Sequence, residues 1–82
     1  MQEEDEVRLA MQRIRAIVRR SARADTVEGV HAFWIQWPEP RPPIELTKQA
    51  LERLELAGEV ERVTLEDKRQ VWRGARKRRR KD

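Results

Sequence analysis

Residues 46–74 constrain the fold of this chain more than any other segment, because they predict a helix, a glycine stop and a pair of strands in that order. Leu51, Leu54 and Ala57 recur along one stripe at the period of an α-helix. Gly58 follows them, and a residue without Cβ adopts the left-handed conformation that ends a helix at no steric cost. The segment therefore predicts an α+β domain.

Two short strands are predicted after this glycine. Residues 60–64 and 69–73 are rich in β-branched and aromatic side chains, and residues 65–68 are polar enough to form the turn between them. The run ALERLELAGEVER at 50–62, with QVWR at 70–73, resembles the third helix and the wing of winged-helix domains. The resemblance implies a mainly helical α+β fold, with three helices and a two-stranded wing. Winged helices bind DNA, RNA or proteins, so the resemblance leaves the function open.

The first helix is predicted at residues 7–23. Apolar residues recur there at three- and four-residue spacing, at Val7, Met11, Ile14 and Val18. The segment contains six arginines and no acid, and four of the arginines share one flank: Arg8, Arg15, Arg19 and Arg23. This flank is either a solvated face or a stripe that faces a polyanion. The acidic residues 3–6 lie where the helix macrodipole favours negative charge, and they are alternatively partners for the basic end of the chain.

Residues 26–37 are predicted to form the second helix, with a strand as the alternative. Asp25 and Glu28 resemble a capping box at its start. Apolar side chains then follow at helical spacing, at Val27, Val30, Trp34 and Trp37. Against the helix, Gly29 costs about 1 kcal/mol in a helix interior, and residues 30–35 are rich in strand-forming side chains.

Prolines separate this segment from the third helix. Four prolines between residues 38 and 43 predict a rigid, extended connector, because proline fixes φ and lacks an N–H donor. Pro40 and Pro43 also have PxxP spacing, so a ligand for a proline-binding module is the alternative. The predicted organisation is an acidic N-terminal end at 1–6, a winged-helix domain at 7–74 and a basic disordered tail at 75–82.

The net charge of +4 is unevenly distributed. Residues 75–82 contain six of the 19 basic residues and one acid, whereas residues 1–74 contain 13 basic and 14 acidic residues, a net charge of −1. Cations in such a tail contact phosphates and release counterions, which gives affinity without sequence information. The tail is therefore predicted to bind nucleic acid through Arg76, Lys77, Arg78, Arg79, Arg80 and Lys81. A nuclear address and a contact with an acidic protein are the alternatives.

Further contacts to nucleic acid are predicted in the third helix and the wing. The residues are Lys48 and Gln49 in the helix, and Arg62, Lys68, Arg69 and Arg73 in the wing. The wing cations suit contact with the minor groove or the backbone. The outward face of the helix also carries Glu52 and Glu55, which would oppose phosphates, so this helix is not expected to read the major groove.

Catalysis is not expected, because the residues that common reactions need are missing or isolated. The chain has no cysteine, one serine and one histidine, so neither a nucleophilic triad nor a cysteine-bound zinc site can be assembled. His31 is predicted to be a core residue rather than a metal ligand, because a metal site needs several convergent ligands. The tryptophans at 34, 37 and 72 are predicted to fill the core rather than to stack on bases. No cofactor, metal or small-molecule substrate is predicted.

These features together predict a small, non-catalytic winged-helix protein that binds nucleic acid, DNA rather than RNA, with a regulatory or accessory role in transcription or replication. The alternative is a protein-interaction module, in which the acidic face of the third helix or Leu56 meets another protein and the tail is incidental. A protein partner or a homodimer is compatible with both. No apolar run approaches the ~18 residues of a membrane span, and the first residues are acidic, so we expect no membrane contact and a cytoplasmic protein, or a nuclear one in a eukaryote.

Overall fold

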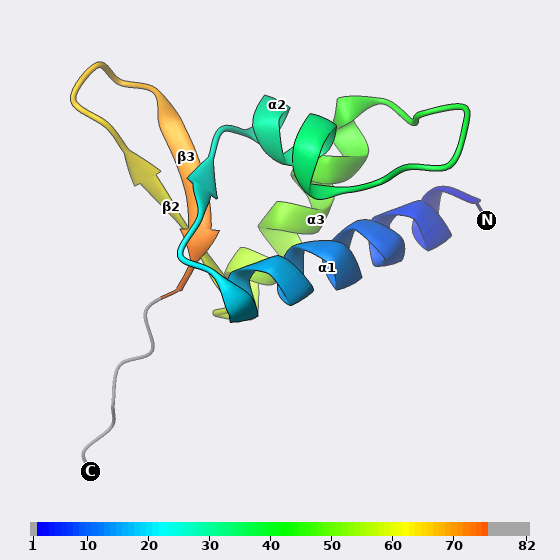
Figure 1. The fold of residues 1–82 in the computed structure, drawn as a ribbon, viewed down its shortest axis with the longest axis horizontal. Coiled ribbons are helices and arrows are strands. Elements are labelled where there is room, and N and C mark those ends of the chain that lie inside the picture. Colours follow the sequence, from blue (N-terminus) through cyan, green and yellow to red (C-terminus); the bar gives the residue numbers. More distant parts are fainter. Residues whose placement is uncertain (1, 76–82) are drawn as a thin grey trace, which may run out of the picture.

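The computed structural model describes residues 2–75 and shows an α+β arrangement, in which a small antiparallel sheet lies at one end of a group of helices (Figure 1). The helices are α1 (Gln2–Arg20), α2 (Val27–Gly29), η1 (Val30–Trp34) and α3 (Ile44–Leu56). The strands are β1 (Ala24–Asp25), β2 (Val60–Thr64) and β3 (Gln70–Gly74). Because η1 continues α2 directly, the described residues form three helical segments and three strands.

The first helix is displaced from its predicted position toward the N-terminus. It begins at Gln2 rather than at residue 7, and it ends at Arg20 rather than at residue 23. Acidic side chains occupy its first turn and Arg19 and Arg20 its last, so both ends complement the macrodipole. The predicted apolar stripe is buried where it faces the core, at Val7, Ala10 and Ile14.

The second segment is helical, as predicted, but it is short and ends at Trp34. Thr26 caps it, because its Oγ1 accepts a hydrogen bond from the N–H of Gly29 at 3.2 Å. The predicted capping box is wrong: the carboxylate of Asp25 accepts instead from the N–H of Thr26 at 2.8 Å. A Cβ on Gly29 would collide with that carboxylate, so a larger residue here would force the Asp25 side chain to move.

The sheet has the strand order β1-β3-β2, and both pairs are antiparallel. The predicted hairpin of β2 and β3 is confirmed, with Val63 opposite Val71 and Arg62 opposite Trp72. The sequence does not predict β1, because two residues are too few to show a period. This strand pairs with the other edge of β3, where Asp25 lies opposite Trp72, and makes the sheet three-stranded.

One cluster of buried side chains joins the helices to the sheet. It consists of Val7, Ala10, Ile14, Val30, Trp34, Ile35, Leu46, Ala50, Leu51, Leu54, Val60 and Trp72. Trp34 and Trp72 are thus core residues, as predicted. Ala57 departs from the prediction, because it is exposed at the C-cap of α3 instead of extending the buried stripe, and Gly58 follows it at φ 78°.

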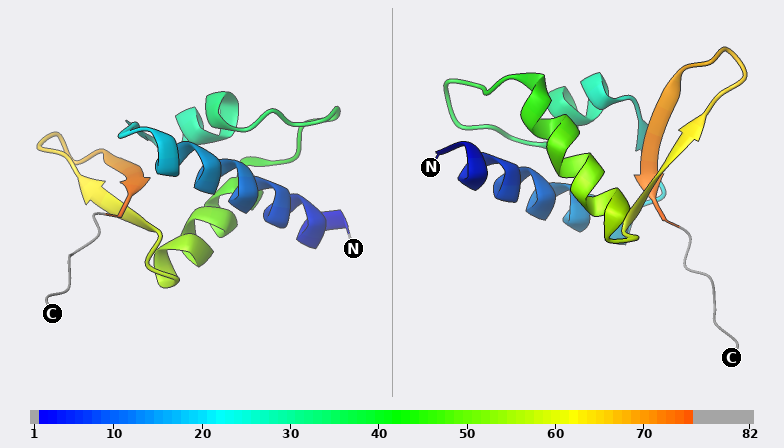
Figure 2. Two further views of the ribbon diagram at one scale, coloured as in Figure 1. Left: turned by 60° about the horizontal axis from the view of Figure 1, so that its bottom comes forward. Right: turned by 180° about the vertical axis from the view of Figure 1, so that it is seen from behind.

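The end of β3 lies against α1 because Gly74 has no side chain. A Cβ at this position would come within 2.9 Å of Cβ of Val18, which is closer than ordinary van der Waals contact. The next N–H, that of Ala75, donates to the carbonyl of Glu59 at 3.1 Å. The described chain therefore ends beside the C-terminal end of α1, at the far end of the helix from the N-terminus (Figure 2).

Candidate nucleic-acid interface

The arginines predicted to bind nucleic acid in the wing are each paired with a carboxylate inside the fold. Arg62 donates to Glu55 at 2.8 Å, Arg69 donates to Asp67 at 2.9 Å, and Arg73 donates to Glu61 at 2.6 Å. The guanidinium of Arg62 also lies 4.6 Å from the centre of the Trp72 ring. These contacts neutralise the three arginines locally, so the β2–β3 hairpin presents much less positive charge than its sequence indicates.

Two acidic partners in this region remain ionised well below neutral pH. The backbone N–H of Arg69, and then its guanidinium, hold the pKa of Asp67 below its usual value. The guanidinium of Arg53 does the same for the pKa of Glu4, which lies on α1. The ion pairs of Arg69 with Asp67 and of Arg53 with Glu4 therefore persist across the physiological pH range.

The outward face of α3 is close to neutral. Lys48 is exposed and Gln49 is half-buried, and neither Lys48 nor Lys68 forms an ion pair with a carboxylate in residues 2–75. Arg53 is held by Glu4 through hydrogen bonds of 2.8 and 3.1 Å. Glu52 is exposed on the same helix. Of the six predicted site residues in the folded part, Lys48, Gln49 and Lys68 are thus left without a carboxylate partner among the described residues.

The six predicted cations of the tail, Arg76 to Lys81, lie outside the described residues. Their point of attachment is described, because Ala75 lies beside the C-terminal end of α1. The charges of α1 near this point therefore bear directly on what the tail can bind.

The six arginines of residues 7–23 divide into paired and unpaired members. Arg15 is bonded to Glu59 at 2.6 and 3.1 Å, and Arg8 lies 3.7 Å from Glu4. The guanidinium of Arg15 holds the pKa of Glu59 below its usual value, and the more distant charge of Arg19 adds to this effect. The other four arginines form no ion pair with a carboxylate of residues 2–75. Three lie on α1 and the fourth, Arg23, lies just after it, and we call them the α1 arginine cluster: Arg13, Arg19, Arg20 and Arg23.

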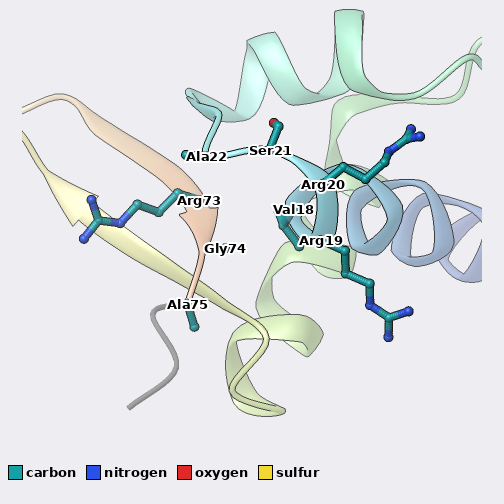
Figure 3. A pocket seen from close by; sticks show the side chains of 8 residues that line it. All are labelled: Val18, Arg19, Arg20, Ser21, Ala22, Arg73, Gly74 and Ala75. Carbon is teal, nitrogen blue, oxygen red and sulfur yellow. The ribbon is translucent and has the colours of Figure 1, made fainter. Parts of the chain in front are cut away.

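A depression of about 470 Å³ lies on the surface where the end of α1 meets the end of β3 (Figure 3). Small residues and backbone line its centre, and Arg19, Arg20 and Arg73 line its rim. Figure 3 shows that these three side chains point away from one another. Guanidinium groups that diverge do not enclose a small anion, but they match an extended polyanion whose charges are spread over several positions.

A second depression, of about 200 Å³, lies between α1 and η1. Arg13 and Arg20 line it together with Phe33, Trp34 and Gln36. Because Arg20 lines both depressions, they adjoin each other along the C-terminal half of α1. Arg13, Arg20 and Phe33 are not among the site residues predicted from the sequence. The available signal was the absence of any acid among the six arginines of residues 7–23.

The polar groups of His31 and Trp37 form hydrogen bonds within the fold. His31 is buried, and its Nδ1 shares a hydrogen bond of 2.6 Å with Oγ1 of Thr47. Trp37 is half-buried and donates from Nε1 to the carbonyl of His31 at 3.1 Å. Within residues 2–75 no group of three histidine, aspartate or glutamate side chains is placed to hold a metal ion. None of the helices described is long and apolar enough to cross a membrane.

No protein-family model, curated protein or solved structure matches this chain. The function is therefore inferred from the chain's own side chains and their placement.

Proposed function

We propose that this chain is a non-catalytic winged-helix domain that binds nucleic acid through the end of α1 and the basic residues 76–81. The order of helices and strands and the sheet order β1-β3-β2 are compatible with a winged helix. In this proposal the β2–β3 hairpin is the wing and α3 is the third helix. The role is regulatory or accessory in transcription or replication, with DNA as the preferred ligand.

The observation that carries the proposal is the contrast in ion pairing. The four members of the α1 arginine cluster have no carboxylate partner in residues 2–75. Two of them, Arg19 and Arg20, line the same depression as Ala75, and six further cations follow Ala75 in the sequence. Arg19 and Arg20 also complement the macrodipole of α1, which accounts for some positive charge at this end. It does not account for Arg13 or Arg23, which lie outside the last turn. A surface of this kind binds phosphates by counterion release.

Lys48, Gln49 and Lys68 have a secondary role in the proposal. Lys68 lies at the tip of the hairpin at φ 73°, exposed, and Lys48 lies in the first half of α3. Both side chains reach a phosphate backbone without first breaking an ion pair seen in residues 2–75. Arg62, Arg69 and Arg73 contribute less, because each would have to exchange a protein carboxylate for a phosphate.

The test compares two double variants that each remove two positive charges. Arg19→Gln/Arg20→Gln alters the proposed surface, and Arg62→Gln/Arg69→Gln alters the paired arginines of the wing. Binding is measured by fluorescence anisotropy on labelled single-stranded DNA, duplex DNA and RNA over a salt series. The first variant is expected to lose about tenfold in affinity and about two units of salt slope, while the second stays close to the unaltered chain. Equal losses from both variants would place the interface elsewhere.

A protein-interaction module is the second candidate, and one observation favours it. Leu56, at the end of α3, is 89% exposed, and the face around it is close to neutral. An exposed leucine on such a face suits a contact with another protein. Sedimentation analysis of the unaltered chain and of Leu56→Ser tests self-association through this face, which is expected to disappear in the variant if the candidate is right.

A further inference from the structure

Phe33 is exposed in a way that the other aromatic side chains are not. It is 76% exposed, whereas Trp34 and Trp72 are 4% and 6% exposed and Trp37 is held by a hydrogen bond to a backbone carbonyl. The buried face of η1 is formed by Val30, His31 and Trp34, so Phe33 adds little to the core. η1 is also a single π-helical turn, a form that is frequent at functional sites. An exposed ring of this size is a large apolar surface that a ligand can bury.

The surroundings of Phe33 are positively charged. Arg13 and Arg20 line the same depression, and none of the residues that line it is acidic. The guanidinium of Arg23 lies 5.7 Å from the centre of the Trp34 ring, and Trp34 forms another part of the lining. Nε1 of Trp34 is buried and donates no hydrogen bond within residues 2–75. Gln36 adds an amide, which can both donate and accept hydrogen bonds at the edge of a base.

We infer that the depression between α1 and η1 binds an unpaired base of a single-stranded nucleic acid, with the base stacked on Phe33 and the flanking phosphates on Arg13 and Arg20. This inference rests on the proposed function and deepens it by naming the form of the ligand. Binding of single strands commonly combines a cationic groove with an aromatic platform on which bases stack. A duplex offers phosphates to the arginines but keeps the faces of its bases covered, so it leaves Phe33 unused.

The position of the depression gives a path for the strand. Arg20 borders both depressions, and the first of them ends at Ala75, where the basic tail begins. A strand that stacks one base on Phe33 therefore passes Arg20 and reaches the depression that Ala75 lines. Single-stranded DNA and RNA share the chemistry that this path recognises.

The experiment measures the affinity of the full chain and its variants for five probes: single-stranded DNA, single-stranded RNA, the same DNA strand with abasic sites, duplex DNA, and poly-glutamate. Phe33→Ala removes the ring, Phe33→Leu keeps an apolar side chain without it, and Phe33→Trp keeps a ring. Leu56→Ala is the matched control, since Leu56 is the other large apolar side chain that is strongly exposed in residues 2–75. Circular dichroism of each variant monitors the fold.

Phe33→Ala and Phe33→Leu are expected to weaken binding of the two intact single strands by about five- to 150-fold, the range for loss of one stacked base. Binding of abasic strand and duplex is expected to stay unchanged, as is every affinity of Phe33→Trp and Leu56→Ala. Intact-strand affinities that do not respond to Phe33→Ala would overturn the inference and leave the proposed function standing. If Phe33→Ala lost affinity equally for the abasic strand, the inference would also be overturned. An equal loss of affinity for poly-glutamate would overturn it too, and would indicate that the ligand is an acidic protein. No binding of any nucleic acid by the unaltered chain would overturn the proposed function as well.

Discussion

The β2–β3 hairpin and the end of α1 both carry several basic residues, yet the fold treats their charges differently. The arginines of the hairpin face carboxylates of the hairpin or of the adjoining end of α3, two to twelve positions away in the sequence, and each forms an ion pair. Residues 13–23 contain no acid, and no acidic side chain of residues 2–75 pairs with the four members of the α1 arginine cluster that lie there. The count of basic residues is thus a poor guide to the charge that a ligand meets.

The reason for the difference is the arrangement of neighbours. Cross-strand pairing places Glu61 opposite Arg73 in the sheet, where opposite charges attract directly. Arg13 and Arg20 face η1 and the residue Gln36, and none of the residues that line this depression is acidic. Exposed ion pairs contribute little to stability, but they decide which cations can contact a phosphate without losing another partner.

The largest expected effect comes from removing residues 76–82, which deletes the six tail cations and leaves the arginines of α1 in place. At about 0.1 M salt the affinity for nucleic acid is expected to fall by about 100-fold or more, and the salt slope by about four to five units. Titration of the two chain lengths with the same labelled strand measures both quantities. Residual binding that still responds to Arg19→Gln/Arg20→Gln would show that the end of α1 is a site by itself, and its absence would make the tail the whole of the interface.

The next largest effect concerns the packing of β3 against α1 at Gly74 and Val18. Gly74→Val places a side chain where Cβ alone would lie 2.9 Å from that of Val18, so β3 has to move away from α1. The free energy of unfolding is expected to drop by about 1–3 kcal/mol, as for other overpacked positions. Urea denaturation measures it. Thr64→Val is the matched control, because this residue is exposed near the other end of the hairpin and its change should be close to neutral.

Freeing the paired arginines of the hairpin is expected to increase binding, which tests whether ion pairing explains the difference between the two regions. Glu55→Gln and Glu61→Gln remove the partners of Arg62 and Arg73 and leave both arginines in place. If ion pairing keeps the hairpin arginines from contacting phosphates, the double variant is expected to bind nucleic acid about three- to tenfold more tightly and with a steeper salt slope. Glu66→Gln changes one charge at the exposed turn without freeing an arginine paired in the fold, and it separates this effect from the change in net charge. If the affinity rose by the same factor per removed negative charge in both variants, the gain would come from net charge and not from freed arginines.

The smallest expected effect is a pH dependence of stability that belongs to η1 rather than to the hairpin. Burial, and then the charge of Arg41, hold the pKa of His31 below its usual value, while Glu45 acts in the opposite direction. The unfolded chain therefore binds more protons than the folded chain between the two pKa values, and stability falls as the pH drops from about 7 to about 5. Thermal unfolding of the unaltered chain and of His31→Gln at several pH values measures the slope, which should be smaller in the variant. Parallel curves would assign the slope to other groups.

Much of the local structure was predictable because it depends on short-range rules. The helix at α3, the glycine that follows it and the β2–β3 hairpin all follow from periodicity, a missing Cβ and β-branched content. The boundaries of α1 were not, because acidic residues at a helix start also look like a charged tail. Strand β1 was not predictable either, since two residues join a sheet only where a partner edge already exists.

The sequence by itself determined α3, the β2–β3 hairpin, the core positions of Trp34 and Trp72 and the number of charges, because periodicity and composition act locally. Only the tertiary structure decided which charges remain available. Arg53 meets Glu4 and Arg15 meets Glu59 across 49 and 44 positions of the chain, and Arg20 meets no carboxylate within residues 2–75. Ion pairs form at distances of a few ångströms, so they depend on which elements pack together, and that is a property of the fold as a whole.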